Sequence, residues 1–155
     1  MPVSGGPYLT AAFFCEKVLQ ERDGVTSFIR LIDRWNIVGP TPTMNPTVLP
    51  TTLVVLFRSG MLRSSAMVSV TPVSPSSVRM QPINAPVLFE GDDERGCGVI
   101  LPLGFPVSEP GLYWFEVALT AQGGQQAVMT HIPMRVVYLQ TGPMIPPPVP
   151  NLGQG

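Results

Sequence analysis

The clearest strand pattern in the chain is Gly111-Leu-Tyr-Trp-Phe-Glu-Val-Ala-Leu-Thr120. Successive side chains of a β-strand point to opposite faces, so the odd positions share one face and the even positions the other. We predict a core face made of Tyr113, Phe115, Val117 and Leu119. The opposite face then carries Leu112, Trp114, Glu116 and Ala118.

The start of this strand also carries a signal for the type of fold. Tyr113 enters the strand directly after a corner that runs from Pro106 to Pro110. In immunoglobulin-like sandwiches a tyrosine at the start of a late strand hydrogen-bonds back to the backbone and pins the corner. Tyr113 is placed for that role, and the alternative is that it is an ordinary core residue.

Breaker residues divide the rest of the chain into segments of strand length. Nineteen prolines and fifteen glycines interrupt it at short intervals, which excludes long helices. The segment 9–22 has some helix propensity, but Asp23-Gly24 after it is the favoured dipeptide of a tight hairpin, so we interpret it as a strand. The predicted strands are residues 9–22, 25–38, 51–58, 63–71, 87–90, 97–103, 111–120 and 126–140.

About eight strands without a helix predict an all-β fold, either a two-sheet antiparallel Greek-key sandwich of the immunoglobulin-like kind or a barrel, and Tyr113 favours the sandwich. In the last strand, Val128, Ile132, Met134, Val136 and Tyr138 are in phase for the core. Pro133 cannot donate a ladder hydrogen bond, so this strand is predicted to be an edge or to carry a bulge there. The sandwich domain spans 1–141, and the Pro-rich tail 142–155 is expected to be disordered.

Composition narrows the classes of partner. Only 12% of the residues are charged and the net charge is −1, with nine basic residues scattered singly, so nucleic-acid binding is not expected. A surface with so few charges favours a protein partner or self-association, and the alternative is a neutral but well-hydrated surface.

No apolar run is long enough to cross a membrane. Cys15 and Cys97 without a secretory leader indicate a cytoplasmic protein with reduced thiols.

Two segments resemble a known family. The opening hairpin Phe14-Cys-Glu-Lys-Val-Leu-Gln-Glu-Arg-Asp-Gly-Val-Thr-Ser-Phe-Ile-Arg30 is similar to that of small bacterial proteins catalogued as a domain of unknown function. Gly111-x-Tyr113-x-Phe115-x-Val117 and Ile132-Pro133-x-Arg135-Val136 resemble the closing hairpin of that family. The resemblance covers roughly residues 8–140. It implies a β-sandwich in a bacterial cytoplasm and implies no activity.

No group of residues forms a convincing catalytic or metal site. His131 is the only histidine, strand phase points it outward opposite Ile132, and we expect it to be solvated rather than catalytic. Asp92, Asp93 and Glu94 are the one candidate cation loop, for calcium, with a solvated turn as the preferred interpretation. Neither a metal nor a cofactor is therefore predicted.

The first predicted hairpin contains four charged residues in mid-strand, Glu16, Arg30, Asp33 and Arg34. Paired carboxylates there would suit acid–base chemistry, but opposite charges on a sheet face more often neutralise one another across strands. We therefore interpret them as structural.

The preferred functional surface is an apolar stripe on the outward phase of the last two strands. Its members are Leu112, Trp114, Met129, Arg135 and Leu139. Large aromatics together with methionine and arginine are enriched at the centres of protein interfaces. The alternative is that both faces of these strands are buried. We thus predict a non-enzymatic interaction or structural module, with a module that binds a small molecule, carbohydrate or calcium as the alternative.

Overall fold

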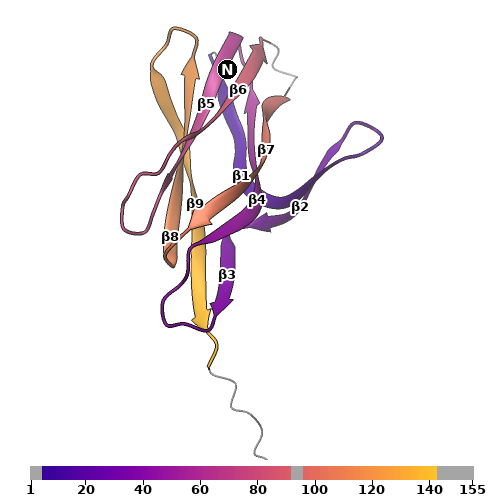
Figure 1. Cartoon of the computed structure of the whole chain (residues 1–155). Coiled ribbons are helices and arrows are strands. Elements are labelled where there is room, and N and C mark those ends of the chain that lie inside the picture. Colours follow the sequence, from indigo (N-terminus) through magenta and orange to yellow (C-terminus); the bar gives the residue numbers. More distant parts are fainter. Residues whose placement is uncertain (1–4, 92–95, 143–155) are drawn as a thin grey trace, which may run out of the picture.

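The computed structural model describes residues 5–91 and 96–142, and within them strands joined by turns and loops make up the chain, with no helix (Figure 1). The all-β prediction is confirmed. The structure has nine strands rather than about eight: β1 (Tyr8–Gln20), β2 (Thr26–Ile32), β3 (Arg34–Gly39), β4 (Thr47–Arg58), β5 (Arg63–Val73), β6 (Ile83–Glu90), β7 (Gly96–Val107), β8 (Gly111–Ala121) and β9 (Gln126–Gln140).

The strands form two sheets that pack face to face. One sheet has the order β2-β1-β4-β7, and the other, which curls into a half-barrel, has the order β3-β9-β8-β5-β6. We call them the four-stranded and the five-stranded sheet. Every strand pair is antiparallel except β3 and β9, which run parallel. The expectation of a purely antiparallel sandwich is wrong at this pair, because the chain crosses between the sheets before β3 instead of folding back in a hairpin.

The extra strand arises at Asp33, where the predicted strand 25–38 divides in two. β2 pairs with β1 in the four-stranded sheet, whereas β3 pairs with β9 in the five-stranded sheet. The carbonyl oxygen of Asp33 accepts a hydrogen bond of 3.0 Å from the amide of Arg135, which joins the crossing point to β9. Beyond it Trp35 and Ile37 pack against the core. One continuous β-rich segment therefore supplies β2 to the four-stranded sheet and β3 to the five-stranded sheet.

Aromatic side chains join the two sheets. Tyr113, Phe115, Val117 and Leu119 are buried as predicted. The ring of Phe115 lies 4.6 Å from that of Phe14 and 4.8 Å from that of Phe105, measured between centroids in edge-on geometry, and both partners belong to the opposite sheet. Such contacts contribute beyond the burial of area alone. The core is thus centred on β8, as its sequence predicts.

The Tyr113 corner is confirmed. The Tyr113 hydroxyl donates a hydrogen bond of 2.9 Å to the carbonyl oxygen of Glu109. Burial raises the pKa of the Tyr113 phenol. The hydroxyl therefore stays protonated as the donor that holds the turn before β8.

Two features of β9 follow from its neighbours. The backbone amide of Arg135 points to the β3 side of β9, where it donates to the carbonyl oxygen of Asp33. Alternate residues of a strand point their amides to the same side, so the nitrogen of Pro133 also faces the β3 side. β3 pairs with β9 only from Arg135 onward, so no strand needs a hydrogen bond from Pro133. The expectation of an edge strand holds only locally around Pro133, because β9 as a whole lies between β3 and β8, and its bulge is not at Pro133. The pairing of β8 with β9 shifts by one residue between Val117 and Ala118. Because of this bulge, Val128 is 53% exposed and Met129 packs against the core, so the predicted phase is wrong at both positions.

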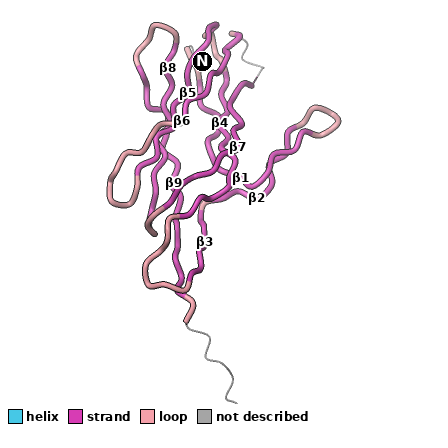
Figure 2. The backbone as a smooth tube through the Cα atoms, in the orientation of Figure 1, coloured by secondary structure: helices cyan, strands magenta, loops and turns pink. Residues whose placement is uncertain are grey.

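The far ends of β1 and β2 form a hairpin that projects from the sandwich (Figures 1 and 2). We call residues 16–31 the β1–β2 arm. At its tip the Glu21 amide donates to the Val25 carbonyl oxygen, 2.8 Å away. The ring of Phe28, within the arm, packs edge-on against the ring of Phe13, which precedes the arm, with 5.0 Å between the ring centroids. Glu16 and Arg30 form an ion pair of 3.3 Å across the arm, as expected. Asp33 and Arg34, which were expected to share in this neutralisation, form no ion pair among the described residues.

Candidate functional site

The central part of the predicted interface lies on the outer face of the five-stranded sheet. Trp114 is 42% exposed, in the middle of a strand whose alternate residues are buried. The register places Trp114 opposite Pro133, and Leu112 opposite Arg135. We call these four residues the Trp114 patch. It presents an indole and an aliphatic side chain to solvent beside one guanidinium group.

The other two predicted interface residues do not join this patch. Met129 packs against the core instead of facing outward, because of the bulge in β9. Leu139 is exposed but lies opposite Val38 of β3, six residues along β9 from Pro133. At about 3.3 Å per residue, that separation is roughly 20 Å. The predicted stripe is therefore divided into the compact Trp114 patch and a separate apolar pair, Val38 and Leu139.

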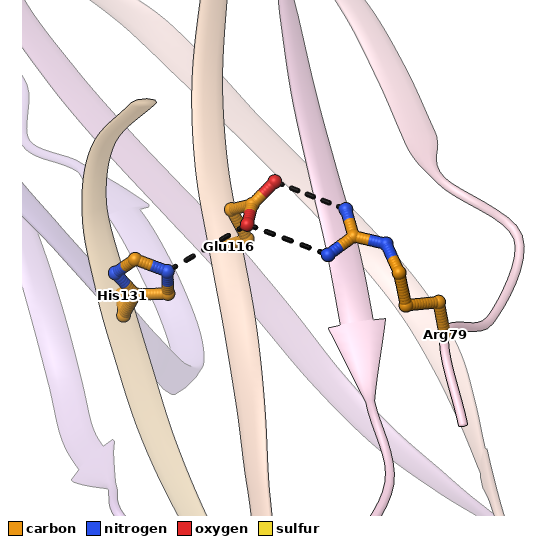
Figure 3. Close-up of polar contacts among 3 residues, drawn as sticks. All are labelled: Arg79, Glu116 and His131. Carbon is orange, nitrogen blue, oxygen red and sulfur yellow. Dashed lines mark hydrogen bonds and ion pairs between the residues drawn. The ribbon is translucent and has the colours of Figure 1, made fainter. Parts of the chain in front are cut away.

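A polar cluster that sequence reasoning missed adjoins the patch. Glu116 lies between Arg79 and His131, two residues beyond Trp114 and thus on the same face of β8 (Figure 3). The Glu116 carboxylate accepts from the Arg79 guanidinium at 3.0 and 3.5 Å, and its Oε2 lies 3.7 Å from Nε2 of His131. The last contact is an ion pair only when the imidazole is protonated. We call these three residues the Glu116 cluster.

Electrostatics indicate what the Glu116 cluster can do. The hydrogen bond from Arg79 is the largest of the effects that lower the pKa of Glu116. The carboxylate is therefore ionised near neutral pH, as a fixed negative charge rather than a proton donor. Both cysteines lie on the four-stranded sheet, so neither supplies a nucleophile here. This arrangement fits a structural or recognition role better than acid–base catalysis.

Strand register explains why only part of this cluster was visible in the sequence. Glu116 and His131 are cross-strand neighbours, so hairpin pairing brings them together. Arg79, in contrast, follows β5 in an irregular segment that returns to the sheet through an isolated bridge with Val73. No local pattern links Arg79 to Glu116, which is 37 positions away. The exposed position of His131 agrees with its expected outward phase.

Replacing Glu116 by glutamine provides a test of this ion pair. At pH 7 we expect the free energy of unfolding to fall by about 0.5 kcal/mol, because the exposed pair is screened by water. A lowered pKa stabilises the native state above the unfolded pKa, about 4.3, and this contribution disappears as the pH falls through the folded value. Urea unfolding of both proteins should therefore converge below about pH 4. A difference that persisted at about pH 3 would contradict an electrostatic origin.

The remaining candidate residues from the sequence are the acidic loop and the two cysteines. Asp92, Asp93 and Glu94 lie outside the described residues. Within the part that is described, no group of three or more histidine, cysteine or acidic residues is placed to hold a metal ion. Cys15 and Cys97 are both free, and burial raises the pKa of the Cys15 thiol. A thiol with a raised pKa is a poor nucleophile at neutral pH.

A cleft that was not predicted lies beside the β1–β2 arm. It has a volume of about 1070 Å³ and lies where the β1–β2 arm leaves β4. β1 pairs with β4 only as far as Cys15 opposite Thr52, so the start of β4 pairs with β7 alone. The cleft is lined by Arg30, Arg34 and Trp35 from the segment around Asp33, and by Val48, Pro50 and Thr51 from β4. Nε1 of Trp35 is buried and has no hydrogen-bond partner among the described residues.

Comparisons with protein-family models and with curated proteins find no match for this chain. No helix in the described residues is long and apolar enough to cross a membrane.

Proposed function

We propose that this protein is a non-enzymatic interaction or structural module that uses the Trp114 patch to hold another protein or a second copy. The exposed indole of Trp114 in the middle of a regular strand is the observation that carries the proposal. Tryptophan and arginine are among the residues most enriched at the energetic centres of interfaces. The apolar surface that Trp114 leaves in water contributes nothing to folding, so a partner that covers it gains that burial instead.

The neighbours of Trp114 define the partner that fits. Leu112 and Pro133 extend the apolar area, and Arg135 has no ion pair among the described residues. A partner with an apolar group beside a carboxylate matches this arrangement, because the carboxylate can accept hydrogen bonds from the guanidinium in a bidentate geometry. Glu116 is already paired with Arg79 and does not compete for Arg135.

Ligand binding is the second candidate function, and the cleft beside the arm favours it. Its volume is at the upper end of those that hold small molecules. Trp35 lines this cleft together with Val48 and Pro50 and offers a ligand an apolar surface beside Arg30 and Arg34. Native mass measurement of the purified protein tests this: a bound small molecule adds its mass to the chain.

The setting of the protein is part of the proposal. A bacterial, cytoplasmic sandwich of the immunoglobulin-like, Greek-key kind is supported by the Tyr113 corner and by two free thiols, which are typical of a reducing compartment. The opening and closing hairpins supply the resemblance to the bacterial family of unknown function.

Replacing Trp114 by glutamate separates a partner surface from a core position. Because Trp114 faces solvent, we expect the variant to keep the circular dichroism of the parent, with a free energy of unfolding within about 1 kcal/mol. In pull-downs from native extract, followed by mass measurement, it should lose a component that the parent retains. Leu88→Glu, at an exposed position on β6, is the matched control and should retain it. Loss of folding in Trp114→Glu, or an unchanged set of bound proteins, would contradict the proposal.

A further inference from the structure

The start of β4 lines the cleft beside the β1–β2 arm, and its backbone has a strand partner on one side only. β7 pairs with β4 from Thr47 to Arg58. β1 pairs with β4 only as far as Thr52, because β1 leaves the sheet there to form the arm. Residues 47–51 therefore have an open edge on the side of the arm.

Two prolines show which backbone groups of β4 lie on this open edge. In an antiparallel pair, opposite residues alternate between those that exchange two hydrogen bonds and those that exchange none. Val48 lies opposite Pro106, and two residues further along β4 Pro50 lies opposite Gly104. Proline has no amide hydrogen, so both are pairs without hydrogen bonds, and their backbone groups point away from the neighbouring strand. The amide and carbonyl groups of Val48 and the carbonyl of Pro50 thus face the side that β1 has left, where no described backbone group bonds to them.

One positively charged group in the lining of the cleft has no partner. The charged residues of the lining are Glu16, Arg30 and Arg34. Glu16 is paired with Arg30, and Arg34 forms no ion pair among the described residues. Asp33, which precedes Arg34, is not part of the lining. The guanidinium of Arg34 therefore suits a carboxylate, with which it can form two parallel hydrogen bonds.

Two further features of the cleft are typical of a ligand site. Arg30 has a φ of 54°, which residues other than glycine rarely adopt, and strained positions of this kind cluster at ligand sites. Trp35, Val48 and Pro50 provide apolar surface beside the guanidinium groups. The cleft thus combines an apolar wall, one free cation and an open stretch of backbone.

We propose that this cleft binds an N-acylated amino acid with an apolar side chain. The carboxylate of the ligand accepts hydrogen bonds from Arg34, its amide group bonds to the open backbone groups of Val48, and its side chain packs on Trp35 and Pro50. Pro50 has no amide hydrogen, so a longer strand would lose a hydrogen bond at its next position along β4. The inference rests on the second candidate function, ligand binding in the cleft, and is independent of the Trp114 patch.

Three compounds separate the contributions of the carboxylate and the amide. In isothermal titration calorimetry with the full chain, we expect N-acetyl-L-phenylalanine to bind most tightly. The dissociation constant should be roughly 10-fold higher for N-acetyl-L-phenylalaninamide, which has no negative charge, and roughly 5-fold higher for 3-phenylpropanoate, which has no amide. Equal affinity for the three compounds would overturn the proposal. So would much tighter binding of a longer peptide that ends in phenylalanine, because a strand would then be the natural occupant.

Arg34→Gln tests where the carboxylate binds. Arg34 is exposed, so the variant should keep the circular dichroism of the parent. Its dissociation constant for N-acetyl-L-phenylalanine should rise roughly 10-fold, to the value for the uncharged amide. Arg22→Gln, an exposed position at the tip of the arm and outside the cleft, is the matched control and should bind like the parent. Unchanged affinity in Arg34→Gln would contradict the proposal.

Failure of this proposal is distinguishable from failure of ligand binding as a function. If none of the three compounds binds, the proposal is wrong, and native mass measurement of the purified protein decides the broader question. A bound molecule of another class would leave ligand binding in place, whereas the mass of the chain alone would remove the second candidate function as well.

Discussion

Phe115→Ala should lower the free energy of unfolding by about 3–5 kcal/mol, the largest effect that we expect of any single substitution in this protein. Phe115 is fully buried, and its ring contacts Phe14 and Phe105 of the opposite sheet. Truncation removes the buried ring and leaves a cavity between two sheets whose backbones are held by hydrogen bonds on both sides. The structure can therefore collapse only partly around the missing atoms.

Urea unfolding followed by fluorescence measures this change, with all proteins at the same concentration because association would itself shift the midpoint. Leu88→Ala is a suitable control, since Leu88 is exposed, and it should change the stability by no more than about 0.5 kcal/mol. A loss below about 1 kcal/mol in Phe115→Ala would show that the two sheets do not close on this ring.

The second large effect is expected at Gly60, in the turn between β4 and β5. Its φ is +58°, and a Cβ atom there would collide with the carbonyl oxygen of Gly5 and come within 2.9 Å of the Cα atom of Gly6. The N-terminal segment is held against this turn by the amide of Met61, which donates to the Gly5 carbonyl oxygen at 3.1 Å. Gly60→Ala must therefore both strain the turn and displace a hydrogen-bonded backbone segment. We expect a loss of about 3 kcal/mol.

Gly123→Ala separates these two costs. Gly123 lies in the turn between β8 and β9 with a similar φ of +71°, but no atom lies within 4 Å of the position that a Cβ atom would occupy there. Alanine at this position has only the left-handed backbone cost, about 1–2 kcal/mol. Equal losses in Gly60→Ala and Gly123→Ala, measured by thermal or urea unfolding, would show that the N-terminal segment does not pack on the β4–β5 turn as described.

Local patterns predicted much of the fold and the central part of the candidate site. Alternation in β8 identified the buried side chains around Phe115 and placed Trp114 on the opposite face, and the structure showed that this face is exposed. The corner before β8 predicted the hydrogen bond of Tyr113. These predictions succeed because alternation and turn chemistry depend on residues that are close together in the chain.

The errors have a common physical cause. Met129 lies inward because β9 bulges against β8, and the Glu116 cluster includes Arg79 because an irregular segment returns to the edge of the sheet. The cleft exists because β1 separates from β4 after Cys15. Each of these features depends on which strands pair and in what register, and the residues involved are far apart in the sequence.

The amino-acid sequence alone determined that the described chain consists of strands, which side chains of the strongest strand face inward, and that a tight turn lies at Asp23-Gly24, because a two-residue period between breakers leaves few alternatives. Only the tertiary structure decided that the chain changes sheets at Asp33, that β3 runs parallel to β9, and that β2 remains an open edge. Pairing is selected by the burial of two whole sheet faces against each other, and that free energy is a property of the assembled sandwich rather than of any one segment.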